Sequence, residues 1–248
     1  MTPTFARLLA DAWGVFRREA DLIMRLAGPF VFLPAFAVQL LCDPLPAIPA
    51  QPRDESAMAA WITLVSAWGE DNAIWYVLAD LVGMIGLAAI ALLLLAPDKP
   101  SVGEALHGAL RRLGRFVLLD LLVAIPVGLG LWIFVLPGLY VQARLIAALA
   151  VLAAEPQHSA TRAIARSWQA TSRATWAILG AVVALFLLQW LAVSPLFPLD
   201  AWLREPGHDN PFVVALVAML LAIAGTVYSV AMLLVGVVSY RRFARSGT

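Results

Sequence analysis

The chain is poor in charge. Only 13% of its 248 residues are charged, against about 25% in soluble globular domains, whereas 62% are hydrophobic against about 45–50%. This composition excludes an ordinary water-soluble fold, and it excludes intrinsic disorder, which needs low hydrophobicity and high net charge. Because 17 basic residues nearly balance 16 acidic ones, there is no bulk attraction to nucleic acid, and we expect no nucleic-acid partner.

Cysteine and histidine are nearly absent. The single cysteine, Cys42, excludes an intramolecular disulfide framework and a cysteine-based zinc cluster. Of the three histidines, His107 and His158 fall on segments expected on one side of a membrane and His208 on the other, so no metal ligands converge. No serine lies in the glycine-flanked turn that a nucleophile uses. We therefore expect no metal, no cofactor and no catalytic residue.

Long apolar runs fill most of the chain. A helix needs about 20 mostly apolar residues to cross a hydrocarbon core of about 30 Å. Six runs meet or approach that length: 22–41, 73–96, 116–136, 138–154, 175–193 and 212–239. They lack the alternation of polar and apolar residues that a spanning strand would show. The sequence predicts an all-α, polytopic membrane helix bundle forming a single integral membrane domain, with a turn at Leu136-Pro137-Gly138 between the third and fourth spans.

The basic residues alternate between the two sides of these spans. Only Arg53 and Arg204 fall in the loops on one side, together with eight acids. On the other side lie Arg7, Arg17, Arg18, Lys99, Arg111, Arg112, Arg115, Arg162, Arg166, Arg173, Arg241, Arg242 and Arg245. Since positive residues collect in cytoplasmic segments, we predict a multi-pass protein of a bacterial inner (plasma) membrane with both termini cytoplasmic.

Three cytoplasmic segments resemble one another. Aligned without gaps, they begin at Thr4, Ser101 and Ser159 and reach Arg18, Arg115 and Arg173. Each begins with a residue that can cap a helix, continues as a basic amphipathic helix and leads into a span. The sequence predicts a threefold repeat of a cytoplasmic amphipathic helix plus a membrane hairpin. Convergence on a basic amphipathic pattern is the alternative explanation of these few identities.

A proline-rich loop follows the first span and leads to a short periodic segment. Apolar residues recur there at helical spacing: Met58, Trp61, Val65 and Trp68. Such a segment is too short to span the membrane, so it predicts an outer interfacial helix that caps the bundle.

The 45 residues from Leu136 to Gly180 resemble a known family. The residues that carry the resemblance are Leu136-Pro137-Gly138-Leu139-Tyr140, Arg144, Glu155 and the segment around Arg166-Ser167-Trp168. They are similar to the bacterial glycerophosphoryl diester phosphodiesterase membrane-domain superfamily, which includes stand-alone six-helix inner-membrane proteins of unknown function. In fused members a separate soluble barrel performs the hydrolysis. This chain has no room for such a barrel, which needs about 250 residues. The resemblance therefore implies a non-enzymatic membrane domain, and no hydrolase residue is carried over.

Four ionisable residues lie inside the expected spans: Arg25, Asp80, Asp120 and Arg144. Each costs at least about 2.5 kcal/mol if it is central and unpaired. Their expected depths predict two ion pairs, Arg25 with Asp120 and Asp80 with Arg144. The alternative for Arg25 is that its side chain snorkels to lipid phosphates.

Three classes of function fit this sequence. The favoured one is a non-enzymatic, membrane-organising or lipid-associated protein whose partners are membrane lipids, particularly anionic ones. Its lipid contacts would be Arg17, Arg18, Arg111, Arg112, Arg115, Arg166, Arg173, Arg241 and Arg242. These arginines can also serve only to set topology. The alternative is a small transporter or permease-like protein using Asp80 and Asp120. An intramembrane enzyme would need a second carboxylate or histidine near either aspartate, and the sequence indicates none.

Overall fold

The computed structural model describes residues 4–46, 48–49, 54–96, 100–205, 207 and 210–246, with the side chains of 132–133 and 245–246 excepted. Arg53, Lys99, His208 and the side chain of Arg245 therefore lie outside the described residues. Every regular element in the described ranges is a helix, and six stretches are long and apolar enough to cross a membrane. The prediction of an all-α, six-span membrane bundle is confirmed.

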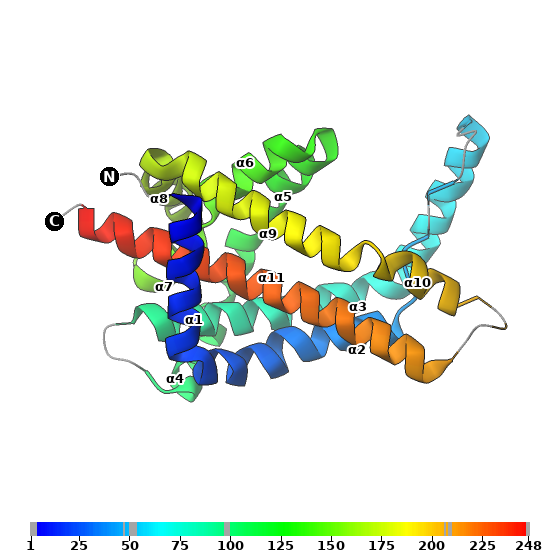
Figure 1. Cartoon of the computed structure of the whole chain (residues 1–248), viewed down its shortest axis with the longest axis horizontal. Helices are drawn as coiled ribbons and strands as arrows, with labels where there is room; N and C mark the ends of the chain where they lie inside the picture. Colours follow the sequence, from blue (N-terminus) through cyan, green and yellow to red (C-terminus); the bar gives the residue numbers. More distant parts are fainter. Residues whose placement is uncertain are drawn as a thin grey trace.

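The elements in chain order are α1 (Phe5–Ala27), the π-helix η1 (Gly28–Phe32), α2 (Leu33–Leu41), α3 (Glu55–Leu95), α4 (Val102–Arg111), α5 (Leu113–Ile133), α6 (Val135–Leu145), α7 (Ala148–Ala154), α8 (Ala160–Thr171), the 3₁₀ turn η2 (Ser172–Ala174), α9 (Thr175–Val193), α10 (Leu196–Leu203) and α11 (Pro211–Ser246). In Figure 1, α1 begins and α11 ends at the same end of the molecule, as an even number of spans requires. The helices α4 and α8 lie at this end too, and α10 lies at the other.

The three predicted surface helices share one design. The side chains of Thr4, Ser101 and Ser159 cap α1, α4 and α8 by accepting a hydrogen bond from the backbone N–H three residues later. The fourth and eighth residues after each cap are buried in all three copies: Leu8 and Ala12, Ala105 and Ala109, Ala163 and Ser167. This common buried face supports the repeat over chance convergence of composition.

Each surface helix meets its span at a similar backbone joint. The joint residues are Glu19 (φ −115°, ψ 19°), Arg112 (φ −110°, ψ 13°) and Ala174 (φ −125°, ψ 17°). The joint follows the cap by fifteen residues in the first and third copies but by eleven in the second. The gap-free alignment of Arg115 with Arg18 and Arg173 is therefore wrong by one helical turn. The residue of the second copy that directly precedes its joint, as Arg18 and Arg173 precede theirs, is Arg111.

The reversal between the third and fourth spans lies at Phe134 (φ −154°, ψ 140°), not at the predicted Pro137-Gly138. Pro137 is in the first turn of α6, where backbone N–H groups have no partner within the helix and the missing donor costs little. A Cβ on Gly130 would lie 2.7 Å from the Cα of Gly138, so α5 and α6 pack backbone against backbone. Glycine at both positions makes this tight hairpin possible.

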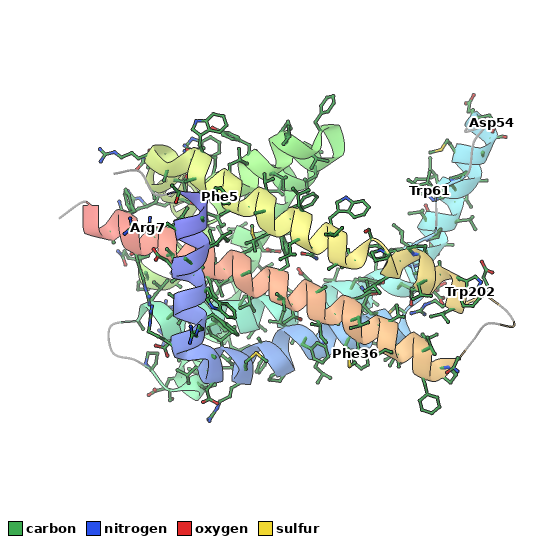
Figure 2. All side chains as sticks on the ribbon, in the orientation of Figure 1. Phe5, Arg7, Phe36, Asp54, Trp61 and Trp202 are labelled. Carbon is green, nitrogen blue, oxygen red and sulfur yellow. The ribbon has the colours of Figure 1, made fainter. Side chains whose placement is uncertain are left out.

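The expected outer interfacial helix is not a separate element. The Met58–Trp68 segment is the first part of the 41-residue α3, which continues into the second span, because no residue between them breaks the helix. Figure 2 shows Asp54 and Trp61 on the part that projects from the bundle. The indole N–H of Trp61 donates to the carbonyl of Pro46 (3.1 Å) and that of Trp68 to the carbonyl of Asp43 (2.8 Å). This segment therefore fastens its own preceding loop to α3.

The fourth span is broken between α6 and α7 at Ile146-Ala147. The helix α11 approaches this break closely, because a Cβ on Gly236 would lie only 2.2 Å from the carbonyl oxygen of Ile146. Buried alanines on α3 and α7 allow a similarly close approach on the other side. The break is thus held from two sides.

Candidate functional site

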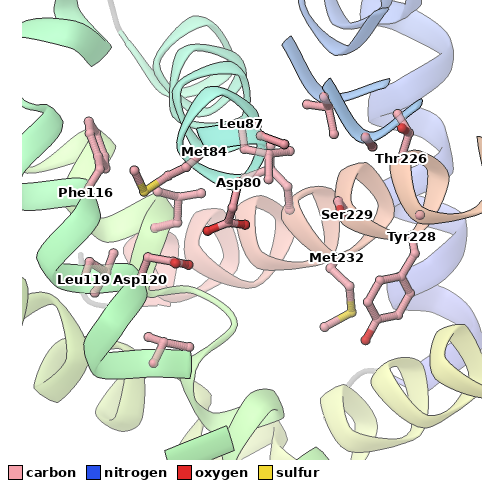
Figure 3. Close-up of a pocket in the computed structure, with 18 of the residues that line it drawn as sticks. Asp80, Met84, Leu87, Phe116, Leu119, Asp120, Thr226, Tyr228, Ser229 and Met232 are labelled. Atoms are coloured by element: carbon pink, nitrogen blue, oxygen red, sulfur yellow. The ribbon is translucent and has the colours of Figure 1, made fainter. Parts of the chain in front are cut away.

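A cavity of about 540 Å³ lies among α2, α3, α5, α6 and α11 (Figure 3). Its walls are mostly apolar and include Met84, Phe116, Leu119 and Met232. Intramembrane ionisable residues mark functional sites more often than chance, and this cavity contains two of the four found in the sequence. It is the candidate functional site.

The two aspartates of the expected spans meet in this cavity. Asp80 projects from α3 and Asp120 from α5, and Figure 3 shows their carboxyl groups pointing toward one another. They are close enough for the charge of Asp80 to be felt at Asp120. Both side chains are exposed to the cavity, and neither has a hydrogen-bond or ion-pair partner among the described residues. The expectation that no second carboxylate lies near either aspartate is therefore wrong.

The sequence analysis missed the neutral polar residues of the cavity, two of which contact each other. Gln142 on α6 donates a hydrogen bond from Nε2 to the hydroxyl oxygen of Tyr228 on α11 (3.2 Å). Both are polar side chains within apolar spans. That position was the available signal, because a polar group in a membrane helix turns toward the protein interior when it has a partner there.

The predicted ion pair between Arg25 and Asp120 does not form. Arg25 instead pairs with Asp21, one helical turn earlier, at 2.9 Å, and both side chains are exposed. The neighbouring Ile23 and Leu26 face the core, so the helix turns Arg25 outward. This orientation is the one that the snorkelling alternative requires.

The predicted pair between Asp80 and Arg144 does not form either. The guanidinium of Arg144 lies 4.4 Å from the ring centroid of Trp168, and its Nη1 donates to the hydroxyl of Thr175 (2.8 Å). The prediction matched depths but not helix faces. Gln142 lines the cavity, and Arg144, two residues later in α6, lies on the opposite face of that helix, toward α8 and α9.

The family-like motif is divided in the structure: Pro137 and Gly138 lie in the hairpin of α5 and α6, and its other residues gather in two clusters. In the first, the backbone carbonyl of Arg144 accepts hydrogen bonds from the hydroxyls of Ser167 (2.9 Å) and Thr171 (3.2 Å), and Trp168 covers the guanidinium. Arg144 is only 6% exposed, and its Nε has no partner. This cluster joins the fourth span to the third surface helix.

The second cluster centres on Glu155, between α7 and α8. Its carboxylate accepts from Arg166 Nε (3.2 Å) and the hydroxyl of Tyr240 (3.0 Å), and it lies 2.9 Å from His158 Nδ1. A hollow of about 600 Å³ beside it is lined by Arg162 and Gln169, among others. These contacts hold the end of α11 against α8.

Several of the nine predicted lipid-contacting arginines have partners within the protein. Arg166 binds Glu155, Arg242 pairs with Asp11, and Arg241 donates to the carbonyl of Leu94. Arg115 is exposed but donates to the carbonyl of Pro156 (2.7 Å). Of the remainder, Arg17, Arg18, Arg111 and Arg173 are exposed and Arg112 is half-buried.

The opposite end of the molecule has its own charged cluster, which the sequence analysis missed. Asp200 is 5% exposed and accepts from Arg204 Nε (3.0 Å), four residues later. Arg204 also donates to the carbonyls of Gln39 (2.6 Å) and Cys42 (3.4 Å). It therefore caps the carbonyl end of α2 and ties α10 to the first span.

In the part of the chain that the structure describes, no group of three or more histidine, cysteine, aspartate or glutamate side chains comes together. Comparisons with protein-family models, curated proteins and solved structures returned no match.

Proposed function

We propose that this protein is a non-enzymatic, membrane-organising or lipid-associated protein of a bacterial inner membrane, with the capped surface helices in the cytoplasm. In this proposal the surface helices lie at the membrane interface and contact anionic lipid headgroups. The observation that carries it is a group of three arginines, Arg111, Arg112 and Arg115, at the joint between α4 and α5. None of the three has an acidic partner among the residues described.

A bound anion would stabilise this arginine group. Burial lowers the pKa of Arg112, and the neighbouring charges of Arg111 and Arg115 lower that pKa further. The Nη1 atom of Arg112 is buried and has no hydrogen-bond partner. A lipid phosphate at this joint would supply both the missing acceptor and the missing negative charge.

Aromatic side chains support a membrane interface at the same level. Trp13 on α1, Trp168 on α8 and Trp176 at the start of α9 are all exposed. Such tryptophans are enriched at the headgroup level of membranes. Similarity to the glycerophosphoryl diester phosphodiesterase membrane domain remains part of the proposal and rests on the sequence motif, in which Arg144, Ser167 and Trp168 lie together in space.

The test is the preference of the protein for anionic over neutral lipid. Quenching of tryptophan fluorescence by brominated phosphatidylglycerol and by brominated phosphatidylcholine gives their relative affinities in mixed vesicles. Neutralising a basic residue at an anionic surface costs about 1 kcal/mol, so the R111Q/R112Q variant should lose about fivefold of the preference per arginine. The R111K/R112K variant keeps both charges and is the matched control. Equal affinities of the wild-type protein for the two lipids would refute the proposal.

A permease-like role is the second candidate, and the cavity that holds Asp80 and Asp120 favours it. This role predicts that vesicles containing the wild-type protein, loaded with a pH-sensitive dye and given an inside-negative potential, take up protons. Vesicles containing the D80N/D120N variant should not. Uptake at the rate of protein-free vesicles would remove this candidate and leave the lipid proposal untouched.

A further inference from the structure

The cavity that holds Asp80 and Asp120 contains negative groups, but none of its described lining residues is positive. No lysine, arginine or histidine is found among its described lining residues, whereas Asp80 and Asp120 project into it from different helices. The remaining wall combines apolar side chains with a few neutral polar groups, such as Gln142 and Tyr228. Its charge is therefore not compensated by any described residue of the lining.

Uncompensated carboxylates in a low-dielectric region are costly, so the pair favours neutralisation, either by taking up a proton or by binding a cation. Apart from the two carboxylates the walls are largely apolar, so they offer few further oxygen ligands to a small metal cation. The volume of about 540 Å³ lies within the range of about 300–1,000 Å³ that is typical of sites for drug-sized molecules. Such sites combine apolar walls with a few polar groups at defined positions, as this cavity does.

The walls also suit the body of an organic cation. The lining of the cavity includes the aromatic residues Phe116 and Tyr228 and the adaptable apolar side chains of Met84 and Met232. We propose that this cavity binds an organic cation with an apolar body, with its positive centre between Asp80 and Asp120. Binding does not require transport. If the permease role holds, this inference names its class of substrate.

The probe is radiolabelled tetraphenylphosphonium, measured by equilibrium dialysis against the full-length protein in a neutral detergent. We expect saturable binding that D80N and D120N each weaken about tenfold and that the double variant abolishes. The matched control is D71N, which removes an exposed carboxylate from the same helix α3 and should not alter binding. Tetraphenylborate has the same shape and the opposite charge, and it should bind at least about tenfold more weakly.

A steric variant tests the cavity without changing charge. Gly225 lines the cavity, and a Cβ built on it meets nothing within 4 Å, so Gly225→Leu should fill space there and reduce tetraphenylphosphonium binding. Elution volume and melting temperature establish that each variant is folded. If the Asn variants fail to fold, the proposal is tested by the Gly225→Leu variant and by the comparison with tetraphenylborate. Absence of saturable binding, equal binding by wild type and D80N/D120N, or equal binding of the two probes would overturn the inference. Binding without flux would support it and count against the permease role alone.

Discussion

Arg144 and Trp168 are stacked, with the guanidinium carbon 4.4 Å from the ring centroid, although 24 positions separate them in the chain. The arginine belongs to the broken fourth span and the tryptophan to the third surface helix. Thr175 completes the contact from the start of the fifth span. Three consecutive segments are therefore fixed relative to one another by one guanidinium that has no carboxylate partner in the described chain.

Replacing the aromatic partner should destabilise the protein. Trp168→Leu removes the ring that faces the largely buried Arg144, and a desolvated cation–π contact is worth about 2 kcal/mol. We expect a lower melting temperature in detergent, followed by static light scattering or by a thiol-reactive dye that labels Cys42 on unfolding. The matched control is Trp176→Leu, because Trp176 is 80% exposed and has no cation–π contact in the described structure. Equal effects of the two substitutions would contradict the assignment.

Gly236 should tolerate no side chain. A Cβ there would lie 2.2 Å from the carbonyl oxygen of Ile146, so Gly236→Ala must push α11 away from the break in the fourth span. Overpacking of this kind costs about 1–3 kcal/mol. Gly225→Ala, on the same helix but with open space around it, should instead be neutral or gain up to about 1 kcal/mol of helix propensity. Unfolding in mixed micelles of increasing SDS content compares the two, and equal stabilities would show that the contact is loose.

The cap of α4 should weaken in acid. The backbone N–H and the hydroxyl of Ser101 donate to Glu104 at 2.7 and 2.8 Å, and these bonds lower the pKa of Glu104. The carboxylate form is therefore favoured in the folded helix. The contribution of this carboxylate to the stability of the folded helix is complete above the usual pKa of glutamate. It is lost as the pH falls through the lowered pKa of the folded state.

The readout for this cap is amide exchange of an α4 peptide by mass spectrometry, corrected for the intrinsic pH dependence of exchange. Protection should fall between neutral pH and a pH below the folded-state pKa. In Glu104→Gln the amide retains a cap but cannot titrate, so its protection should not change with pH in this range. Persistence of the acid effect in that variant would assign it to another group.

The sequence predicted what depends on local pattern. The caps at Thr4, Ser101 and Ser159 follow from residue type, and the buried positions after them follow from helical periodicity. The earlier joint of the second copy was not predictable in this way, because the residues around Arg112 remain basic on both sides of it.

The pairing of charges inside the bundle depends on more than depth. Counting residues placed Asp120 at the depth of Arg25 and Asp80 at the depth of Arg144, near opposite faces of the membrane, whereas the structure brings both aspartates into one cavity. Arg144 was matched to Asp80 by depth alone, whereas it lies on the face of α6 opposite Gln142 and contacts Trp168. Backbone breaks and helix rotation are set by tertiary packing, which local sequence pattern does not encode.

The proposed orientation can be tested by labelling single cysteines. The native thiol of Cys42 is buried, so Cys42→Ala provides a background in which Asp71→Cys and Arg162→Cys place one exposed thiol at each end. The excess of positive residues around the surface helices favours retention of that end in the cytoplasm. In intact spheroplasts a membrane-impermeant maleimide should label Asp71→Cys at once and Arg162→Cys only after permeabilisation. Loss of one basic residue leaves the charge asymmetry intact, so the variant itself should not invert the protein. The opposite labelling pattern would place the arginine group of α4 outside the cell and exclude a cytoplasmic lipid surface as its target.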